Sequence, residues 1–349
     1  MYNLTKKGLL TSIMIVALSF LGACSTDMKE EVSTNKVKLS LDDNKIYVGF
    51  SLDTLAEDRW YKDKDAFETT VKELGGEVKT LAANGIDSVQ IQQAELLIAE
   101  GVDVLVVVPH NADIASEIVE KAHRANVKVI SYDRLIKNAD VDYYISYDNK
   151  EVGRLQAKEL LKKVSKGNFA YIGGAETDNN AVLFKEGAME VLQPYIDKEE
   201  IQLVFDQYTD EWQPKKAEVN MAEALSEQKN NIQAVVAAND GTAGGVINAL
   251  QKNNLNIPVT GQDAEVAAIK RILAGTQTMT VYKPIQAIAK NAAEIAMKVG
   301  SGEKITTSTA VNNGKIDVPS ILLDPVVVTA QNIEETVIKD QFIKKEELK

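Results

Sequence analysis

The sequence predicts an α/β protein built of two doubly wound lobes, each a parallel sheet between layers of helices. From residue 45 onward, short β-rich runs alternate regularly with longer amphipathic runs. Residues 104–108 are five apolar residues in a row, which is typical of a strand buried on both faces of a parallel sheet. The pattern restarts near residue 142, and about ten strands in all exceed what one small domain needs.

The expected elements follow in chain order. In the first half we expect strands at 45–52, 78–82, 104–108 and 127–131, and helices at 57–74, 87–99 and 114–125. In the second half we expect strands at 143–147, 169–172, 201–205, 234–238, 259–260 and 278–281, and helices at 150–164, 181–192, 214–228, 242–251, 264–273 and 284–299. Gly75-Gly76 marks a helix end and Pro214 a helix start. Beyond residue 302 only short strand-like runs remain, among them 321–323 and 326–328.

The N-terminus predicts a secretory signal and a lipid anchor rather than part of the fold. Lys6-Lys7 is a short basic region, and residues 8–20 form an apolar run too short to span a bilayer comfortably. Small residues then precede Cys24, an arrangement that resembles the bacterial lipobox. We therefore expect a signal peptide at 1–23, lipid attachment at Cys24, and a polar, flexible tether at 24–44.

Composition and motifs exclude several functional classes. The formal net charge of −12 argues against binding to nucleic acid or to an anionic membrane surface. A single cysteine and two histidines offer no disulfide and no metal-ligand spacing. The nucleophile elbow and the phosphate-binding loop are also missing from the sequence. We therefore expect no enzyme activity, no cofactor and no metal.

Polar and aromatic residues gather where the predicted strands end. In an open parallel sheet the carboxyl ends of the strands are where ligands bind. The residues there are Asp53, Arg59-Trp60, Pro109-His110-Asn111, Asp133-Arg134, Gly173-Gly174 through Asn179-Asn180, Asp206 to Trp212, Asn239-Asp240, Gln262-Asp263 and Tyr282-Lys283. Planar Asp, Asn and Arg side chains give donors and acceptors at fixed geometry, and the two tryptophans suit the apolar face of a pyranose. This composition predicts a sugar site between two closing lobes.

Each of these residues also has a plainer interpretation. Asp133 and Arg134 could form a surface ion pair. Trp60 lies at helical spacing before Phe67 and could be a core residue. Asn180 and Asn239 could serve only as helix caps, and Lys283 could be solvated.

Several runs resemble bacterial D-xylose-binding proteins of sugar ABC transporters, within the ribose- and galactose-binding-like group. The similarity covers roughly residues 45–345, in order and nearly without gaps. The runs that carry it are 131–134 (SYDR), 144–149 (YISYDN), 261–264 (GQDA), 274–284 (AGTQTMTVYKP), 312–314 (NNG) and 336–340 (TVIKD).

The resemblance implies a type I periplasmic-binding-protein fold with the ligand in the cleft between the lobes and a three-segment hinge. It implies an N-terminal lobe at 45–147 plus 284–317 and a C-terminal lobe at 148–283 plus 318–349. It also implies nine ligand-binding residues: Arg59, Trp60, Asp133, Arg134, Asn180, Trp212, Asn239, Asp263 and Lys283. All nine were already among the strand-end residues.

The expected function is therefore extracytoplasmic capture of D-xylose, or a similar monosaccharide, and its delivery to the transmembrane subunits of an ABC permease. The lipobox departs from the family members that are free in the periplasm and implies a lipoprotein on the outer face of the membrane. We expect a monomer. A sensor subunit that reports xylose to a membrane histidine kinase and a receptor for another pentose or hexose stay open as alternatives. A sugar-converting enzyme is disfavoured by the missing motifs, and a DNA-binding regulator by the signal peptide and the acidic charge.

Overall fold

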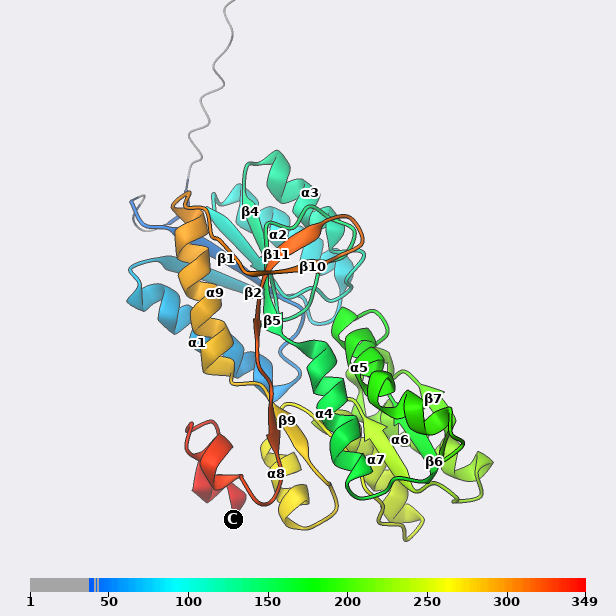
Figure 1. Cartoon of the computed structure of the whole chain (residues 1–349). Helices are drawn as coiled ribbons and strands as arrows, with labels where there is room; N and C mark the ends of the chain where they lie inside the picture. The colour runs from blue at the N-terminus through cyan, green and yellow to red at the C-terminus, as the bar shows by residue number, and fades with distance from the viewer. Residues whose placement is uncertain (1–37, 41, 43) are drawn as a thin grey trace, which may run out of the picture. The chain divides into compact units, whose positions relative to one another are not determined.

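The computed structural model describes residues 38–40, 42 and 44–349 of the chain (Figure 1). The predicted signal peptide, the lipid site at Cys24 and most of the predicted tether lie outside the described residues. The described part has two α/β lobes with parallel sheets, as the sequence predicted. No helix in this part is long and apolar enough to cross a membrane.

The first lobe is built on a seven-stranded sheet with the order β10-β11-β5-β4-β3-β1-β2, parallel except for β10. Its strands are β1 (Tyr47–Leu52), β2 (Glu77–Ala82), β3 (Val104–Val107), β4 (Lys128–Tyr132), β5 (Tyr143–Tyr147), β10 (Thr309–Asn312) and β11 (Asp317–Leu323). Its helices are α1 (Asp58–Glu73), α2 (Asp87–Ala99), α3 (Ser116–Arg124) and α9 (Ile285–Gly300).

Helices cover both faces of this sheet because its central strands are apolar on both faces. Phe50 of β1 and Val106 of β3 pack against α1 and α9 on one face. Leu105 and Val107 of β3 pack against α2 and α3 on the other. β3 is completely buried, as the uninterrupted apolar run at 104–108 predicted.

The second lobe has a three-stranded parallel sheet with the order β7-β6-β8. Single bridges, Val235 to Val259 and Gln262 to Val281, lead from it to the antiparallel pair β9-β12. Its strands are β6 (Gly167–Ile172), β7 (Ile201–Gln207), β8 (Ala234–Ala237), β9 (Thr280–Tyr282) and β12 (Val326–Val328). Its helices are α4 (Asn149–Leu161), α5 (Asn179–Ile196), α6 (Pro214–Glu227), α7 (Asp240–Lys252) and α8 (Val266–Leu273). Short 3₁₀ helices lie at Asp210–Trp212 and Lys345–Leu348, and a short π-helix lies at Glu334–Ile338.

The chain passes between the lobes three times: after β5, between β9 and α9, and between β11 and β12 (Figure 1). β11 pairs with β5 as far as Leu323, so the first-lobe sheet extends beyond the crossing predicted at 317/318. The apolar residues Ile321 and Leu323 hold the strand there by packing against the first-lobe core.

Candidate functional site

A small cavity lies between the two lobes, where the carboxyl ends of their strands meet. About 250 Å³ of space there, part of it open to solvent, is not occupied by protein atoms. Its lining contains all nine residues predicted from the sequence: Arg59, Trp60, Asp133, Arg134, Asn180, Trp212, Asn239, Asp263 and Lys283. It also contains four residues outside that set: Glu57, Asp178, Phe184 and Gln262.

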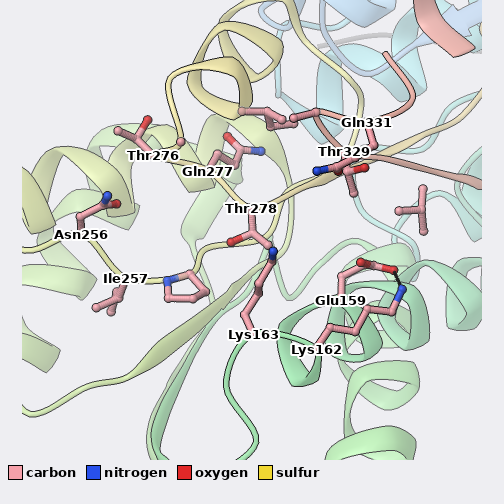
Figure 2. A pocket seen from close by; sticks show the side chains of 15 residues that line it. Glu159, Lys162, Lys163, Asn256, Ile257, Thr276, Gln277, Thr278, Thr329 and Gln331 are labelled. Atoms are coloured by element: carbon pink, nitrogen blue, oxygen red, sulfur yellow. Dashed lines mark hydrogen bonds and ion pairs between the residues drawn. The ribbon is translucent and has the colours of Figure 1, made fainter. Parts of the chain in front are cut away.

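A larger hollow lies elsewhere on the second lobe (Figure 2). Lys162 and Lys163, at the end of α4, line it together with Thr276, Thr278 and Thr329. None of the nine predicted residues lines this hollow, and Lys162 is already paired with Glu159. The interlobe cavity is therefore the candidate site.

Asp133 is the centre of the charge network in the cavity. Its Oδ2 accepts hydrogen bonds from Arg59 Nη2 at 2.9 Å and Lys283 Nζ at 3.3 Å, and its Oδ1 accepts one from Asn180 Nδ2 at 3.0 Å. Burial raises the pKa of Asp133, but Arg59 and Lys283 outweigh it and hold the pKa well below its usual range. The carboxylate is therefore ionised and rigidly held.

Asp133 reaches this position because its backbone leaves the strand in the left-handed region. Its φ is +59°, directly after β4, and Arg134 N–H donates to the Tyr132 carbonyl at 2.7 Å to close a tight turn. Such a backbone is costly for a residue with a side chain, and Asp and Asn tolerate it better than most. The turn directs Asp133 and Arg134 to neighbouring positions in the cavity lining.

Arg134 links the two lobes. Its Nη1 donates to Asp53 Oδ2 at 2.6 Å within the first lobe, and its Nε lies 2.7 Å from Asp178 Oδ2 of the second lobe. Burial lowers the pKa of Arg134, but Asp178 and Asp53 outweigh it and raise the pKa above its ordinary value. Asp133 and Arg134 are 1% and 4% exposed and pair with other residues, so they do not form with each other the surface ion pair that the sequence left open.

Arg59 forms a second link between the lobes. Its Nη1 donates to Asp263 Oδ1 at 3.2 Å, across the cleft, while its Nη2 holds Asp133. Asp263 has a φ of +100°, a second left-handed residue at the site. Lys283 is 3% exposed, so the alternative interpretation of Lys283 as a solvated side chain is wrong.

The two tryptophans occupy the cavity from opposite lobes. Trp60 is 1% exposed and belongs to the first-lobe core, as its helical spacing predicted, and it also lines the cavity. The Arg59 guanidinium lies 4.2 Å from the centre of its ring system. Trp212 contacts Phe184 edge-on at 6.4 Å, and its Nε1 donates to Asp178 at 3.2 Å.

The asparagines differ in their role as caps. Asn239 caps α7, since its Oδ1 accepts a hydrogen bond from Thr242 N at 2.8 Å, and it also lines the cavity. Asn180 is not a cap, because Asp178 caps α5 in its place. The Asn180 amide instead bridges Asn149, at 2.8 Å, and Asp133.

The lining residues outside the predicted nine come from positions next to the predicted ones. Glu57 precedes α1 and accepts a hydrogen bond from Trp60 Nε1 at 3.2 Å, and burial raises its pKa. Asp178 caps α5 and Phe184 lies within that helix. Asp178 falls in the predicted strand-end run 173–180, but a capping Asp before a helix gives no separate sequence signal for a second role. Gln262 stood at a predicted strand end, but it was not among the residues that the resemblance implied.

The charges in the cavity nearly balance. Three cations (Arg59, Arg134 and Lys283) face four acids (Asp133, Asp178, Asp263 and Glu57), and burial raises the pKa of Glu57 and of Asp178. A balanced set of paired charges favours an uncharged ligand rich in hydroxyls over an anion or a cation. Within the described residues, no three acidic, histidine or cysteine side chains are grouped to hold a metal ion.

Comparison with known proteins agrees with this geometry. Residues 48–304 match the periplasmic binding protein domain family. The chain is 48% identical to the D-xylose-binding periplasmic proteins of Haemophilus influenzae and Escherichia coli, over 86% and 87% of this chain and 91% and 92% of theirs.

Among solved structures, a carbohydrate transporter solute-binding protein of Chloroflexus aurantiacus in complex with D-glucose superimposes with a TM-score of 0.81 at 32% identity. The match covers 86% of this chain and 97% of that one. These relatives are sugar-binding transport proteins rather than enzymes. The chain belongs to the periplasmic binding protein domain family, and its similarity to D-xylose-binding proteins places it among the sugar-binding members that serve ABC transporters.

Proposed function

We propose that this protein captures D-xylose outside the cytoplasm and delivers it to an ABC sugar permease. The observation that carries the proposal is that all nine residues predicted from strand ends and family resemblance line one interlobe cavity. The near balance of charge there fits an uncharged ligand rich in hydroxyls, such as a monosaccharide. The identity to two D-xylose-binding proteins supports xylose over other sugars.

In the proposed mechanism an open form binds the sugar on one lobe, and closure completes the ring of hydrogen bonds. Asp133, Arg134 and Asp263 bind hydroxyls through two atoms each, while Trp60 and Trp212 contact the ring. Asn180, Asn239, Arg59 and Lys283 complete the set. Arg134 with Asp178 and Arg59 with Asp263 then hold the lobes together around the ligand.

We further propose that the protein is held at the outer face of the membrane by a lipid on Cys24, with residues 24–44 as the tether. The support is the signal-like segment and the small residues before the cysteine. Replacing Cys24 by Ala in the full chain is expected to release the protein from the membrane fraction. Retention of the Cys24→Ala protein in that fraction would contradict the anchor and leave the sugar proposal untouched.

A thermal-shift panel tests the sugar assignment. A ligand that binds only the folded protein raises the melting temperature. The panel is xylose, arabinose, ribose, glucose and galactose, and xylose is expected to give the largest shift. A shift with another sugar and none with xylose would refute the specificity and keep the binding function. No shift with any sugar would refute both.

A further inference from the structure

Gln262 occupies a fixed position in the wall of the interlobe cavity. Its backbone bridges to Val281, and its carbonyl accepts a hydrogen bond from Asp240 N at 2.9 Å. The residue is 2% exposed and lines the cavity beside Asp263 and Lys283. Both neighbours are among the nine residues proposed to contact the sugar.

The side-chain oxygen of Gln262 is the unusual feature of the site. Its Oε1 is buried and has no hydrogen-bond partner among the described residues. The two asparagines of the same cavity differ in this respect. Asn180 Oδ1 accepts from Asn149, and Asn239 Oδ1 accepts from the backbone of α7.

A buried amide oxygen without a donor is unfavourable, because it has lost water and gained nothing in return. A donor that enters the cavity removes this penalty. Gln262 is uncharged, so it adds an acceptor without disturbing the nearly balanced charges around it. An uncharged acceptor in a charge-paired cavity fits a hydroxyl group.

We infer that Gln262 Oε1 accepts a hydrogen bond from one ring hydroxyl of the bound sugar and helps to select sugars that carry that hydroxyl. The inference rests on the proposed function and deepens it. A site built to hydrogen-bond a hydroxyl discriminates strongly against an analogue that lacks it, because the buried partner is then left unpaired. Gln262 is thus a specificity-determining residue in addition to the nine.

The test compares how each protein variant binds xylose and how it binds xylose analogues that lack one hydroxyl. Calorimetry would measure the affinity of the wild type, Gln262→Met and Gln262→Glu for xylose and for xylose analogues that each lack one hydroxyl. Met has a similar length and no acceptor, whereas Glu keeps an acceptor oxygen. Gln93→Met is the matched control, since Gln93 Oε1 also has no partner but lies on α2, away from the cavity.

Gln262→Met is expected to weaken xylose binding about tenfold, the size of one typical hydrogen bond. It should bind one particular deoxy analogue as well as the wild type does, because both partners of the lost bond are then missing. Gln262→Glu should keep the wild-type discrimination against that analogue. Gln93→Met should keep the wild-type affinity for every sugar.

Xylose affinity of Gln262→Met within about twofold of the wild type would overturn the inference and leave the proposed function intact. The same loss of affinity in Gln262→Met for xylose and for every analogue would also overturn the inference. Such a result would mean that Gln262 affects only the shape of the cavity. If Gln262→Met does not fold, loss of the analogue discrimination in Gln262→Glu would overturn it instead. A wild type that binds no sugar would overturn both proposals.

Discussion

Three residues of the proposed sugar site have a left-handed backbone although none of them is glycine. The φ angles are +59° at Asp133, +56° at Trp212 and +100° at Asp263. Each such residue costs on the order of 1 kcal/mol or more, so the surrounding contacts must hold it in place. Residues with this kind of strain are concentrated at binding sites, which agrees with the role proposed for these three.

Gly174 offers a test of how Trp212 is placed. A Cβ atom at Gly174 would lie only 2.0 Å from the Trp212 ring, so Gly174→Ala must displace the indole. We expect Gly174→Ala to weaken xylose binding roughly tenfold or more, since stacking and the hydrogen bond to Asp178 are lost together. Calorimetry measures the effect.

Gly241→Ala is the control for this variant. Its added Cβ would meet its nearest neighbour, Pro214, at an ordinary 3.4 Å. It should bind xylose nearly as the wild type does. Wild-type affinity in Gly174→Ala would show that the position of Trp212 does not matter for binding.

Much of the site could be predicted at the level of single residues, because charged and aromatic side chains at the ends of buried strands are conspicuous. The dual role of Trp60 in core and cavity could not be resolved, since helical spacing describes only its core side. Asp178 falls within the predicted strand-end run 173–180, but no pattern singled it out. Its importance comes from Arg134, which is far from it in sequence and meets it only when the lobes come together.

At the level of elements, the end of β4 and the start of α5 form the main connection across the cleft. Asp133 and Arg134 follow β4, and Asp178 and Asn180 begin α5. Two contacts join them, Arg134 to Asp178 at 2.7 Å and Asn180 to Asp133 at 3.0 Å. Contacts of this kind stabilise the closed form and therefore slow ligand release.

Asp178→Asn is expected to release xylose several-fold to tenfold faster while association changes less than about twofold, because interface changes act mostly on dissociation. Stopped-flow measurement of tryptophan fluorescence can follow both rates. Asn can still cap α5, so the helix start is kept.

Asp148→Asn is a matched control, because Asp148 also caps a helix, α4, and also pairs with an arginine, Arg154, at 3.1 Å. That pair is partly exposed and does not cross the cleft. The Asp148→Asn variant should therefore release xylose at the wild-type rate. Equal rates in Asp178→Asn and Asp148→Asn would contradict the role of the cross-lobe ion pair.

Carboxyl groups also cluster where α7 and α8 begin. Asp240 is fully buried and accepts hydrogen bonds from Gln277, Thr280 and Glu265 N. Burial raises the pKa of Asp240, and the nearby Asp263 raises it further. Burial and Asp240 likewise raise the pKa of Glu265.

A raised carboxyl pKa means that the folded chain keeps a proton that the unfolded chain releases above about pH 4. The free energy of unfolding of the sugar-free protein should therefore fall as the pH rises from about 5 to about 8. Asp240→Asn should reduce this slope. Urea unfolding at the two pH values measures it, and an identical slope in wild type and variant would contradict the assignment.

The alternation of elements could be predicted because each strand and helix carries its own periodic signal. The outer edge of the second sheet was less predictable. Val259 and Gln262 make only single bridges there, where the sequence predicted a strand at 259–260. These single bridges form only because β8 and β9 lie on either side of the segment. The periodicity of the segment's own sequence does not describe such neighbours.

At the scale of the whole described chain, three crossings allow two separately packed lobes to close on one ligand. Each lobe has its own apolar clusters, and the cavity between them is lined almost entirely by polar and aromatic side chains. The three crossings were implied by the family resemblance. The position of the last one was not, because β11 continues in the first sheet as far as Leu323.

Calorimetric titration of D-xylose into the wild type, Asp133→Ala and Trp212→Ala tests the central claim most directly. The wild type should bind one xylose per chain. Each variant should bind about a hundredfold more weakly or not measurably, because each loses either charge-assisted hydrogen bonds or the aromatic contact. Near-unchanged xylose affinity in both folded variants would contradict the assignment of the interlobe cavity as the sugar site.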